Sequence, residues 1–314
     1  MIDRQSLDEV LTQYKENFPS HWEEEKYKWE AIKCFQDNWD VNAQDFPAML
    51  SKSLSKTKNL LAANYDFSRK MIEFYAEQDP EEVRSMFMQL FDEKIDLIER
   101  INGFIARADK LLETYGPAGK QHYQKDGTIT TYLWLRYPDK YWIYRFRQVK
   151  AFSDNLKSNY AFKQGASANN IRLCADFYSE VRDVIAQDSE LVNLFKNALT
   201  DNCYSDPQLV TLTADIAYFS KDIKLPIIDG NNGEKEKPVT PSEKDNSTYT
   251  KEDFLSEVFM PEEKYDKLST VLLNKKNIIL QGAPGVGKTF SAKRLAYSLI
   301  DAVNDDAIEF VQFH

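Results

Sequence analysis

The feature that most constrains this chain lies near its C-terminal end. Residues 277–300 read NIILQGAPGVGKTFSAKRLAYSLI, so a short apolar segment precedes the pattern G-x-x-x-x-G-K-T and an amphipathic segment follows it. The pattern is filled by Gly282, Gly287, Lys288 and Thr289. A strand before the loop and a helix after it are the context that this motif requires. The sequence therefore predicts a phosphate-binding loop that opens an α/β nucleotide-binding domain.

The expected chemistry follows from the backbone of such a loop. Glycines let the chain wrap so tightly that several N–H groups point at phosphates, and the N-terminus of the following helix favours negative charge. Lys288 should reach the β- and γ-phosphates, and Thr289 should bind Mg²⁺. The cofactors expected are Mg²⁺ with ATP or GTP, which these residues do not distinguish. The residues predicted to bind nucleotide are Gly282, Ala283, Pro284, Gly285, Val286, Gly287, Lys288, Thr289 and Phe290.

Hydrolysis requires further groups, because an acidic residue on a later strand must hold Mg²⁺ and position water. The last residues, IEFVQFH, are expected to form the second strand of the domain, and no later strand follows them. The nucleotide-binding domain is therefore expected to be incomplete. We expect no catalytic residue in this chain and no turnover by the chain alone.

The segment KNIILQGAPGVGKTFSAKRLAYSLI, followed by FVQFH, resembles the AAA+ domain of McrB-type subunits of modification-dependent (type IV) restriction systems. The resemblance covers about residues 254–314. It implies a hexameric motor that hydrolyses GTP or ATP and couples hydrolysis to DNA recognition and to a partner nuclease of the McrC type. It also implies that the lead-in around Phe259 lies near the base of the nucleotide. Ala283 stands where many members of the family have a second proline.

The composition of the chain changes along its length. Residues 1–225 are predicted to form a mostly α-helical domain with a small β-hairpin, an α+β domain for target recognition. Residues 226–252 are rich in Gly, Asn, Pro, Ser and charge but poor in large apolar side chains, which is typical of a flexible linker. Residues 253–314 are expected to form the first part of the AAA+ domain.

Apolar periodicity predicts the helices of the first domain. Residues 1–35 should form two helices separated by a break at Phe18-Pro19-Ser20, and residues 43–76 two shorter ones. Residues 80–115 should form one continuous helix, which Asp79 caps and which Gly116-Pro117 ends. This helix could pack in a bundle or form the arm of a coiled-coil dimer. Further helical segments are expected at residues 149–156, 171–186 and 190–198.

Residues 128–147 are predicted to form the β-hairpin, because TITTYLWL and YWIYRFR are rich in β-branched and aromatic residues and a Tyr-Pro-Asp-Lys turn separates them. Two hypotheses remain open for its aromatic face. It could stack on a DNA base while arginines hold phosphates, or it could be ordinary core. The candidate DNA contacts are Arg136, Trp142, Arg145 and Arg147.

The overall charge limits the partners of the chain. The net charge is −10 and the pI near 5.0, so any nucleic-acid-binding face must be local. Three scattered cysteines and the lack of a long apolar run favour a cytoplasmic protein without a membrane span. Two other functions stay open: an AAA+ protein-remodelling ATPase with a protein-binding N-terminal domain, and a non-catalytic binding module. DNA binding by the N-terminal domain would discriminate between the restriction-system hypothesis and the protein-remodelling one.

Overall fold

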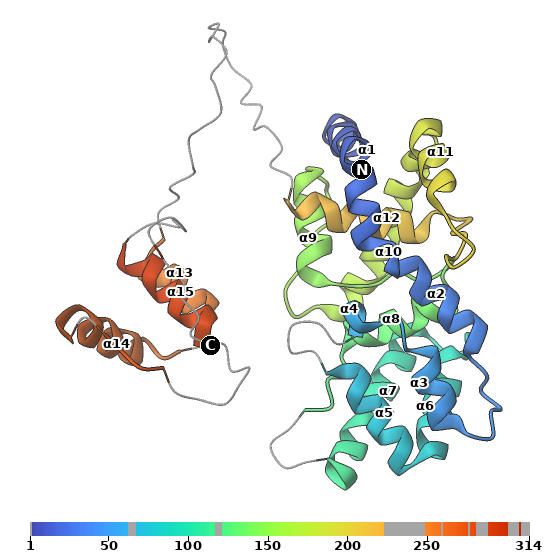
Figure 1. The fold of residues 1–314 in the computed structure, drawn as a ribbon, viewed down its shortest axis with the longest axis horizontal. Coiled ribbons are helices and arrows are strands. Elements are labelled where there is room, and N and C mark those ends of the chain that lie inside the picture. The colour runs from blue at the N-terminus through green and yellow to red at the C-terminus, as the bar shows by residue number, and fades with distance from the viewer. Residues whose placement is uncertain are drawn as a thin grey trace, which may run out of the picture. The chain divides into compact units, whose positions relative to one another are not determined.

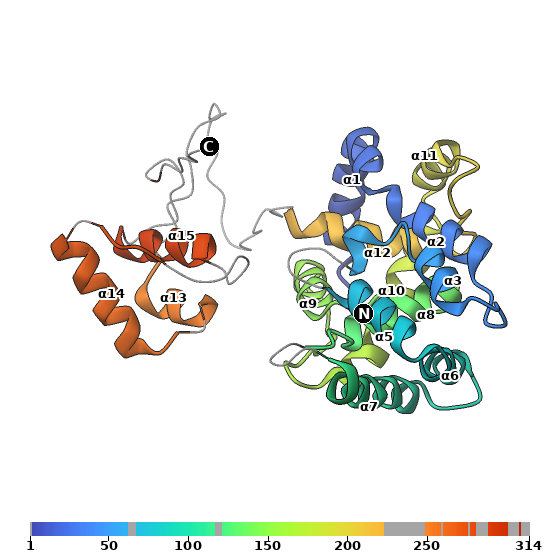
Figure 2. The same ribbon diagram turned by 60° about the horizontal axis from the view of Figure 1, so that its bottom comes forward.

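The computed structural model describes residues 2–61, 67–116, 121–222, 249–258, 260–275, 277–280, 288–300 and 308. The chain divides into two compact units, Met1–Asp229 and Gly230–His314, and each is described by itself (Figures 1 and 2). The predicted linker falls almost entirely outside the described residues, so the domain boundaries stay predictions. Within the described ranges every regular element is a helix. No helix among them is long and apolar enough to cross a membrane.

The N-terminal unit is a helical bundle, which confirms the mostly α-helical prediction. Figure 1 shows α8 between one group of helices that includes α1, α9, α10 and α12 and another that includes α3, α5, α6 and α7. A short 3-10 turn, Ser220–Asp222, follows the last helix. The α-helices are α1 Arg4–Glu25, α2 Tyr27–Asn38, α3 Phe46–Ser53, α4 Lys58–Leu61, α5 Ser68–Gln78, α6 Pro80–Phe91, α7 Leu97–Tyr115, α8 Asp126–Arg136, α9 Phe146–Asn155, α10 Ser167–Ile185, α11 Ser189–Ala198 and α12 Val210–Phe219.

The predicted break at Phe18-Pro19-Ser20 is wrong. Helix α1 runs through Pro19 and ends six residues later at Glu25. The apolar stripe of Tyr14, Phe18 and Trp22 continues at helical spacing across the proline, and all three side chains are buried. The packing of this face holds the helix together even though Pro19 cannot donate a backbone hydrogen bond.

The predicted continuous helix over residues 80–115 is also wrong. It is two helices, α6 and α7, separated by residues 92–96. Asp96 begins α7, because its carboxylate accepts hydrogen bonds from the backbone N–H groups of Ile98 and Glu99. The two helices contact each other, and Arg107 of α7 donates to Glu82 of α6 at 2.6 Å. The apolar stripe is therefore buried inside the unit, which leaves no seam for a coiled-coil arm.

The predicted β-hairpin at residues 128–147 is wrong as well. The residues predicted as its first strand lie in α8. Those predicted as its second strand lie mostly in residues 137–145, which contain no strand, and the last two begin α9. All residues from Thr128 to Leu135 are buried, so α8 has no polar face to reveal its helical period. The hydroxyls of Thr130 and Thr131 bond to the carbonyl of Gly127 within the helix. Tertiary burial thus overrides the β-propensity of these residues.

A group of five polar side chains joins the two ends of the N-terminal unit. We call it the buried charge cluster: Tyr14, His21, Glu25, Lys28 and Asp215. Asp215 of α12 accepts hydrogen bonds from Tyr14 at 2.6 Å and His21 at 2.9 Å, and it pairs with Lys28. Lys28 also pairs with Glu25 at 2.8 Å. Burial alone would raise the pKa of Asp215, but Lys28 and His21 outweigh it and lower that pKa to about 2.

The C-terminal unit has a separate, smaller core. Its described helices are α13 Lys251–Glu257, α14 Glu262–Lys275 and α15 Lys288–Leu299. Helix α13 begins with a capping box in which the Thr250 and Asp253 side chains satisfy each other's backbone N–H groups. The buried side chains of this core are Tyr249, Phe254, Val258, Tyr265, Leu295 and Tyr297.

Candidate functional sites

The P-loop motif leads directly into a helix. Helix α15 begins at Lys288, so the N-terminus of the helix lies at the end of the motif. The side chain of Thr289 is exposed in the first turn, and Phe290 is 48% exposed. Residues 282–287 and Phe259 lie outside the described residues, as does the side chain of Lys288. The described part of the site is therefore a helix N-terminus with an exposed hydroxyl, which suits an anion.

The C-terminal half of helix α15 contacts helices α13 and α14. Tyr265 of α14 donates a hydrogen bond to Ser298 at 3.1 Å, and Arg294 pairs with Glu257 of α13. The guanidinium of Arg294 also lies 5.0 Å from the centre of the Phe290 ring. These contacts anchor the helix to the small core and leave its first turn exposed.

The strand expected before the P-loop is absent from residues 277–280, which are the part of it that the structure describes. Residues 277–280 have no regular secondary structure, and Ile279 is 92% exposed. A strand is defined by hydrogen bonds to a neighbouring strand, and the described residues contain none. The second predicted strand, at residues 308–314, lies outside the described residues except for residue 308, which has no regular secondary structure. An open apolar groove of about 370 Å³ adjoins this segment, and its lining is Leu272, Ile278, Leu280, Thr289, Ala292, Leu295 and Ala296.

The four candidate DNA contacts do not lie on a common sheet face. Trp142 is only 8% exposed, and its ring packs 5.2 Å from that of Tyr178. Arg136 covers the ring of Tyr137 at 5.1 Å. Arg145 is half-buried and Arg147 is exposed on α9. Trp142 therefore fits the hypothesis that the aromatic face is ordinary core, because its side chain is buried.

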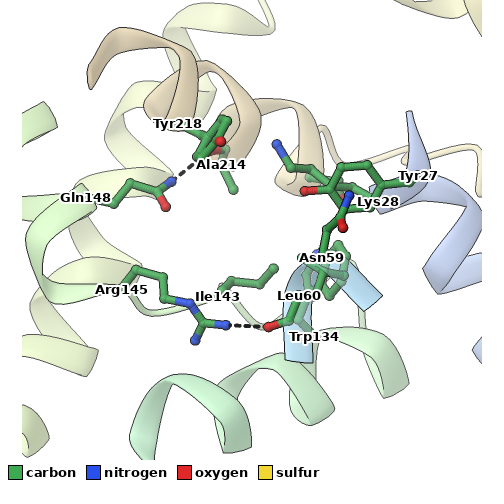
Figure 3. A pocket seen from close by; sticks show the side chains of 11 residues that line it. Tyr27, Lys28, Asn59, Leu60, Trp134, Ile143, Arg145, Gln148, Ala214 and Tyr218 are labelled. Atoms are coloured by element: carbon green, nitrogen blue, oxygen red, sulfur yellow. Dashed lines mark hydrogen bonds between the residues drawn. The ribbon is translucent and has the colours of Figure 1, made fainter. Parts of the chain in front are cut away.

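Arg145 instead lines a cavity that sequence reasoning missed. The cavity has a volume of about 200 Å³ and lies within the N-terminal unit (Figure 3). Arg145 donates hydrogen bonds to the carbonyl of Leu60 at 3.1 Å and to Thr131 Oγ1 at 3.3 Å. The lining residues are Tyr27, Lys28, Asn59, Leu60, Trp134, Ile143, Arg145, Gln148, Thr211, Ala214 and Tyr218.

The walls of this cavity combine aromatic rings with amide and cationic groups. Trp134 is fully buried, and its indole N–H donates to Thr211 Oγ1 at 3.1 Å. The Gln148 amide donates to the carbonyl of Ala214 at 3.1 Å, so its own carbonyl oxygen lies on the other side of the amide (Figure 3). Lys28 brings the buried charge cluster to the wall, and its ammonium lies 4.3 Å from the Tyr218 ring centre. Among the described residues that line the cavity, none is acidic.

Comparisons with known proteins give matches that are confined to part of the chain. A family model described as Novel STAND NTPase 3 matches residues 259–314. The Type IV methyl-directed restriction enzyme EcoKMcrB subunit of Escherichia coli (strain K12) is 46% identical over 78 residues. This alignment covers 25% of the chain and 17% of the relative. No solved structure matches the chain.

The two matches support a nucleoside triphosphatase of the McrB type, although the matching family is a STAND NTPase and the motif resemblance predicted an AAA+ domain. The family match includes the whole P-loop motif, residues 282–289. The N-terminal helical unit lies outside the family match. The chain is therefore related to McrB-type subunits over part of its length.

Proposed function

We propose that this chain is the nucleotide-binding subunit of a McrB-type restriction or defence system. In the complete protein, binding and hydrolysis of ATP or GTP would be coupled to DNA recognition by the N-terminal unit and to a nuclease of the McrC type. The observation that carries this proposal is the 46% identity to an McrB subunit, together with an NTPase family match that spans the P-loop motif.

The roles of the site residues follow the chemistry of the loop. Residues 282–287 cradle the phosphates with backbone N–H groups, and Lys288 neutralises the β- and γ-phosphates. Thr289 supplies a hydroxyl to Mg²⁺, for which its exposed place in the first turn of α15 is suitable. Phe259 contacts the base. The motor acts as a homo-hexamer, as the resemblance to McrB-type subunits implies.

The test of the nucleotide site is a titration of the chain with fluorescent ATP and GTP analogues, with and without Mg²⁺. Lys288→Ala should weaken binding by about tenfold to a hundredfold, because it removes a charge-assisted hydrogen bond. Lys275→Ala is the matched control, since Lys275 is an exposed lysine at the end of α14. Equal affinities of the chain and Lys288→Ala would contradict the proposal.

The DNA-reading role has its own test. The chain is titrated with methylated and unmethylated duplexes at two salt concentrations. Binding should weaken with salt, and Arg147→Ala should reduce the salt slope by about one unit if this exposed arginine contacts a phosphate. Absence of binding to any duplex or single strand would instead favour the protein-binding alternative for the N-terminal unit.

A further inference from the structure

We infer that Glu257 couples occupancy of the proposed nucleotide site to the docking of Tyr249, the first described residue of the C-terminal unit. The inference rests on the proposed function and adds a regulatory link that the P-loop residues do not provide by themselves. The link is a series of side-chain contacts that runs from the first turn of α15 to the start of α13. We call these residues the Glu257 network: Tyr249, Glu257, Phe290 and Arg294.

Phe290 is the part of the Glu257 network that lies at the nucleotide site. It is the third residue of α15, so its backbone N–H is one of the first-turn donors that have no acceptor within the helix. These donors are the groups that the helix after a P-loop directs at phosphate. The ring of Phe290 is 48% exposed, so its conformation depends on the side chains that cover it.

Arg294 covers this ring from one turn further along α15. The two residues stand at positions i and i+4 of the helix, so they share a face. The guanidinium lies 5.0 Å from the centre of the Phe290 ring, within the range of a cation–π contact. Arg294 is only 27% exposed, and its Nε pairs with Glu257, the last residue of α13. Arg294 is thus held by a residue outside α15, and it holds the Phe290 ring in turn.

A single oxygen of Glu257 connects the two ends of the network. Glu257 Oε2 pairs with Arg294 and also accepts a hydrogen bond from the phenol of Tyr249 at 3.1 Å. Tyr249 is 5% exposed, and its ring packs edge to face against that of Tyr297, 5.6 Å away. Docking of Tyr249 therefore fixes the carboxylate, and the carboxylate fixes Arg294 over the Phe290 ring.

The direction of the coupling follows from the cost of ordering side chains. A ligand at the first turn of α15 needs Phe290 in one conformation, and ordering that side chain on binding costs free energy. The cost is smaller when Arg294 already holds the ring, so a docked Tyr249 favours nucleotide binding. Coupling is reciprocal, so bound nucleotide favours docking of Tyr249 by the same factor. Because Glu257 and Arg294 are partly exposed, the factor should be about threefold to tenfold.

Two variants with the same chemical change test the coupling. Tyr249→Phe removes only the hydroxyl that reaches Glu257. Tyr265→Phe removes a matching hydroxyl, which donates at the same distance of 3.1 Å to Ser298 in the last turn of α15. Each variant of the whole chain is titrated with non-hydrolysable ATP and GTP analogues in the presence of Mg²⁺. Tyr249→Phe should weaken binding by about threefold to tenfold, whereas Tyr265→Phe should change it by less than about twofold.

Hydrogen exchange gives the reciprocal measurement and separates coupling from a loss of stability. The backbone N–H of Phe254 donates to the Thr250 carbonyl at 3.1 Å, and that of Asp253 donates to Thr250 Oγ1 at 3.3 Å. Both amides therefore report on the start of α13, next to Tyr249. Nucleotide should slow their exchange in the unchanged chain and in Tyr265→Phe, by about the factor measured for affinity. In Tyr249→Phe this slowing should be lost, whereas a purely structural phenol would leave the ratio of exchange rates with and without nucleotide unchanged.

The outcomes separate the inference from the function on which it rests. Loss of affinity and of nucleotide-dependent protection in Tyr249→Phe alone supports the coupling. If the unchanged chain binds neither analogue, the proposed function fails and the inference fails with it. If the chain binds nucleotide and Tyr249→Phe binds it equally well, the inference alone is overturned. Equal weakening by Tyr249→Phe and Tyr265→Phe also overturns it, because a general loosening of the unit would then explain both.

Discussion

The phenol of Tyr14 donates a hydrogen bond to the carboxylate of Asp215, 2.6 Å away, across 201 residues of sequence. Both side chains are buried, and the bond joins the first helix of the N-terminal unit to its last. The negative charge of Asp215 is balanced by Lys28, which is also buried. The fold thus depends on a charged group that burial alone would disfavour.

Asp215→Asn should destabilise the N-terminal unit strongly. The variant keeps the shape of the side chain but leaves the buried Lys28 ammonium with Glu25 as its remaining acidic partner. Removing one partner of a buried ion pair typically costs about 3–5 kcal/mol. Urea unfolding followed by circular dichroism measures the loss. Asp154→Asn is the control, because its pair with Lys150 is solvent-exposed and should be worth less than about 1 kcal/mol. Equal losses in the two variants would show that the cluster contributes no more than a surface pair.

Asp206 should make stability fall as the pH rises. Burial raises the pKa of Asp206 to about 6, although the backbone N–H groups of Thr211 and Leu212 partly oppose it. Since the folded pKa lies above the ordinary value of 3.8, the contribution is complete below pH 3.8 and is lost as pH rises through 6. The shift corresponds to about 3 kcal/mol. The contribution of Asp215 to stability has the opposite pH dependence, because the pKa of this carboxyl is lowered to about 2. It is complete above about pH 4 and is lost as the pH falls toward 2.

The measurement for Asp206 is urea unfolding of the chain and of Asp206→Asn at several pH values from 4 to 7. The difference between the two proteins should shift by about 3 kcal/mol in favour of the variant over this range. Asp201→Asn, an exposed neighbour, should show no such trend. A difference that does not change with pH would exclude titration of Asp206 in this window.

Truncation of Trp142 should lower stability strongly, whereas truncation of Arg147 should leave stability almost unchanged. Trp142→Ala removes a buried ring that packs on Tyr178 and should cost about 3–5 kcal/mol. Arg147→Ala removes an exposed side chain and should change stability by less than about 0.5 kcal/mol. Thermal unfolding of both variants provides the comparison. A fully stable Trp142→Ala would restore the earlier hypothesis of an exposed aromatic face.

Pro19→Ala should stabilise the N-terminal unit. Pro19 lies inside α1 with its ring exposed, and it leaves the carbonyl of Lys15 without the usual helical hydrogen bond. Alanine restores that bond at a position where the helix is already formed, so a gain of about 1–3 kcal/mol is expected. Glu16→Ala, at an exposed site in the same helix, should stay within about 0.5 kcal/mol. An unchanged or lower unfolding midpoint for Pro19→Ala would mean that the helix bends to accommodate the ring.

The sequence predicted best those features that depend on neighbouring residues. The P-loop motif is contiguous, and the NTPase family match over residues 259–314 contains all eight of its positions. The helices at residues 149–156, 171–186 and 190–198 were also found, to within a few residues of α9, α10 and α11. These segments have a clear polar face, so periodicity is a sufficient signal.

Features set by distant contacts could not be predicted in this way. Residues 92–96 break the long stripe because α6 and α7 pack against each other, which local periodicity does not reveal. Helix α8 is buried on all sides, so its aromatic and β-branched residues look like a strand. The cavity draws on positions as far apart as Tyr27 and Tyr218, and no spacing rule connects them. The walls of the cavity form only once five helices have packed.

The long separation between Asp215 and its partners also limits when the unit can fold during synthesis. Tyr14 precedes Asp215 by 201 residues and Lys28 precedes it by 187. At translation rates of about 5–20 residues per second, the earlier side chains wait on the order of ten seconds or more for their acidic partner to emerge. The N-terminal helices can form during that time, but the cluster that holds them to α12 cannot. We expect nascent chains released before residue 215 to be substrates for chaperones and proteases, and longer ones to be resistant.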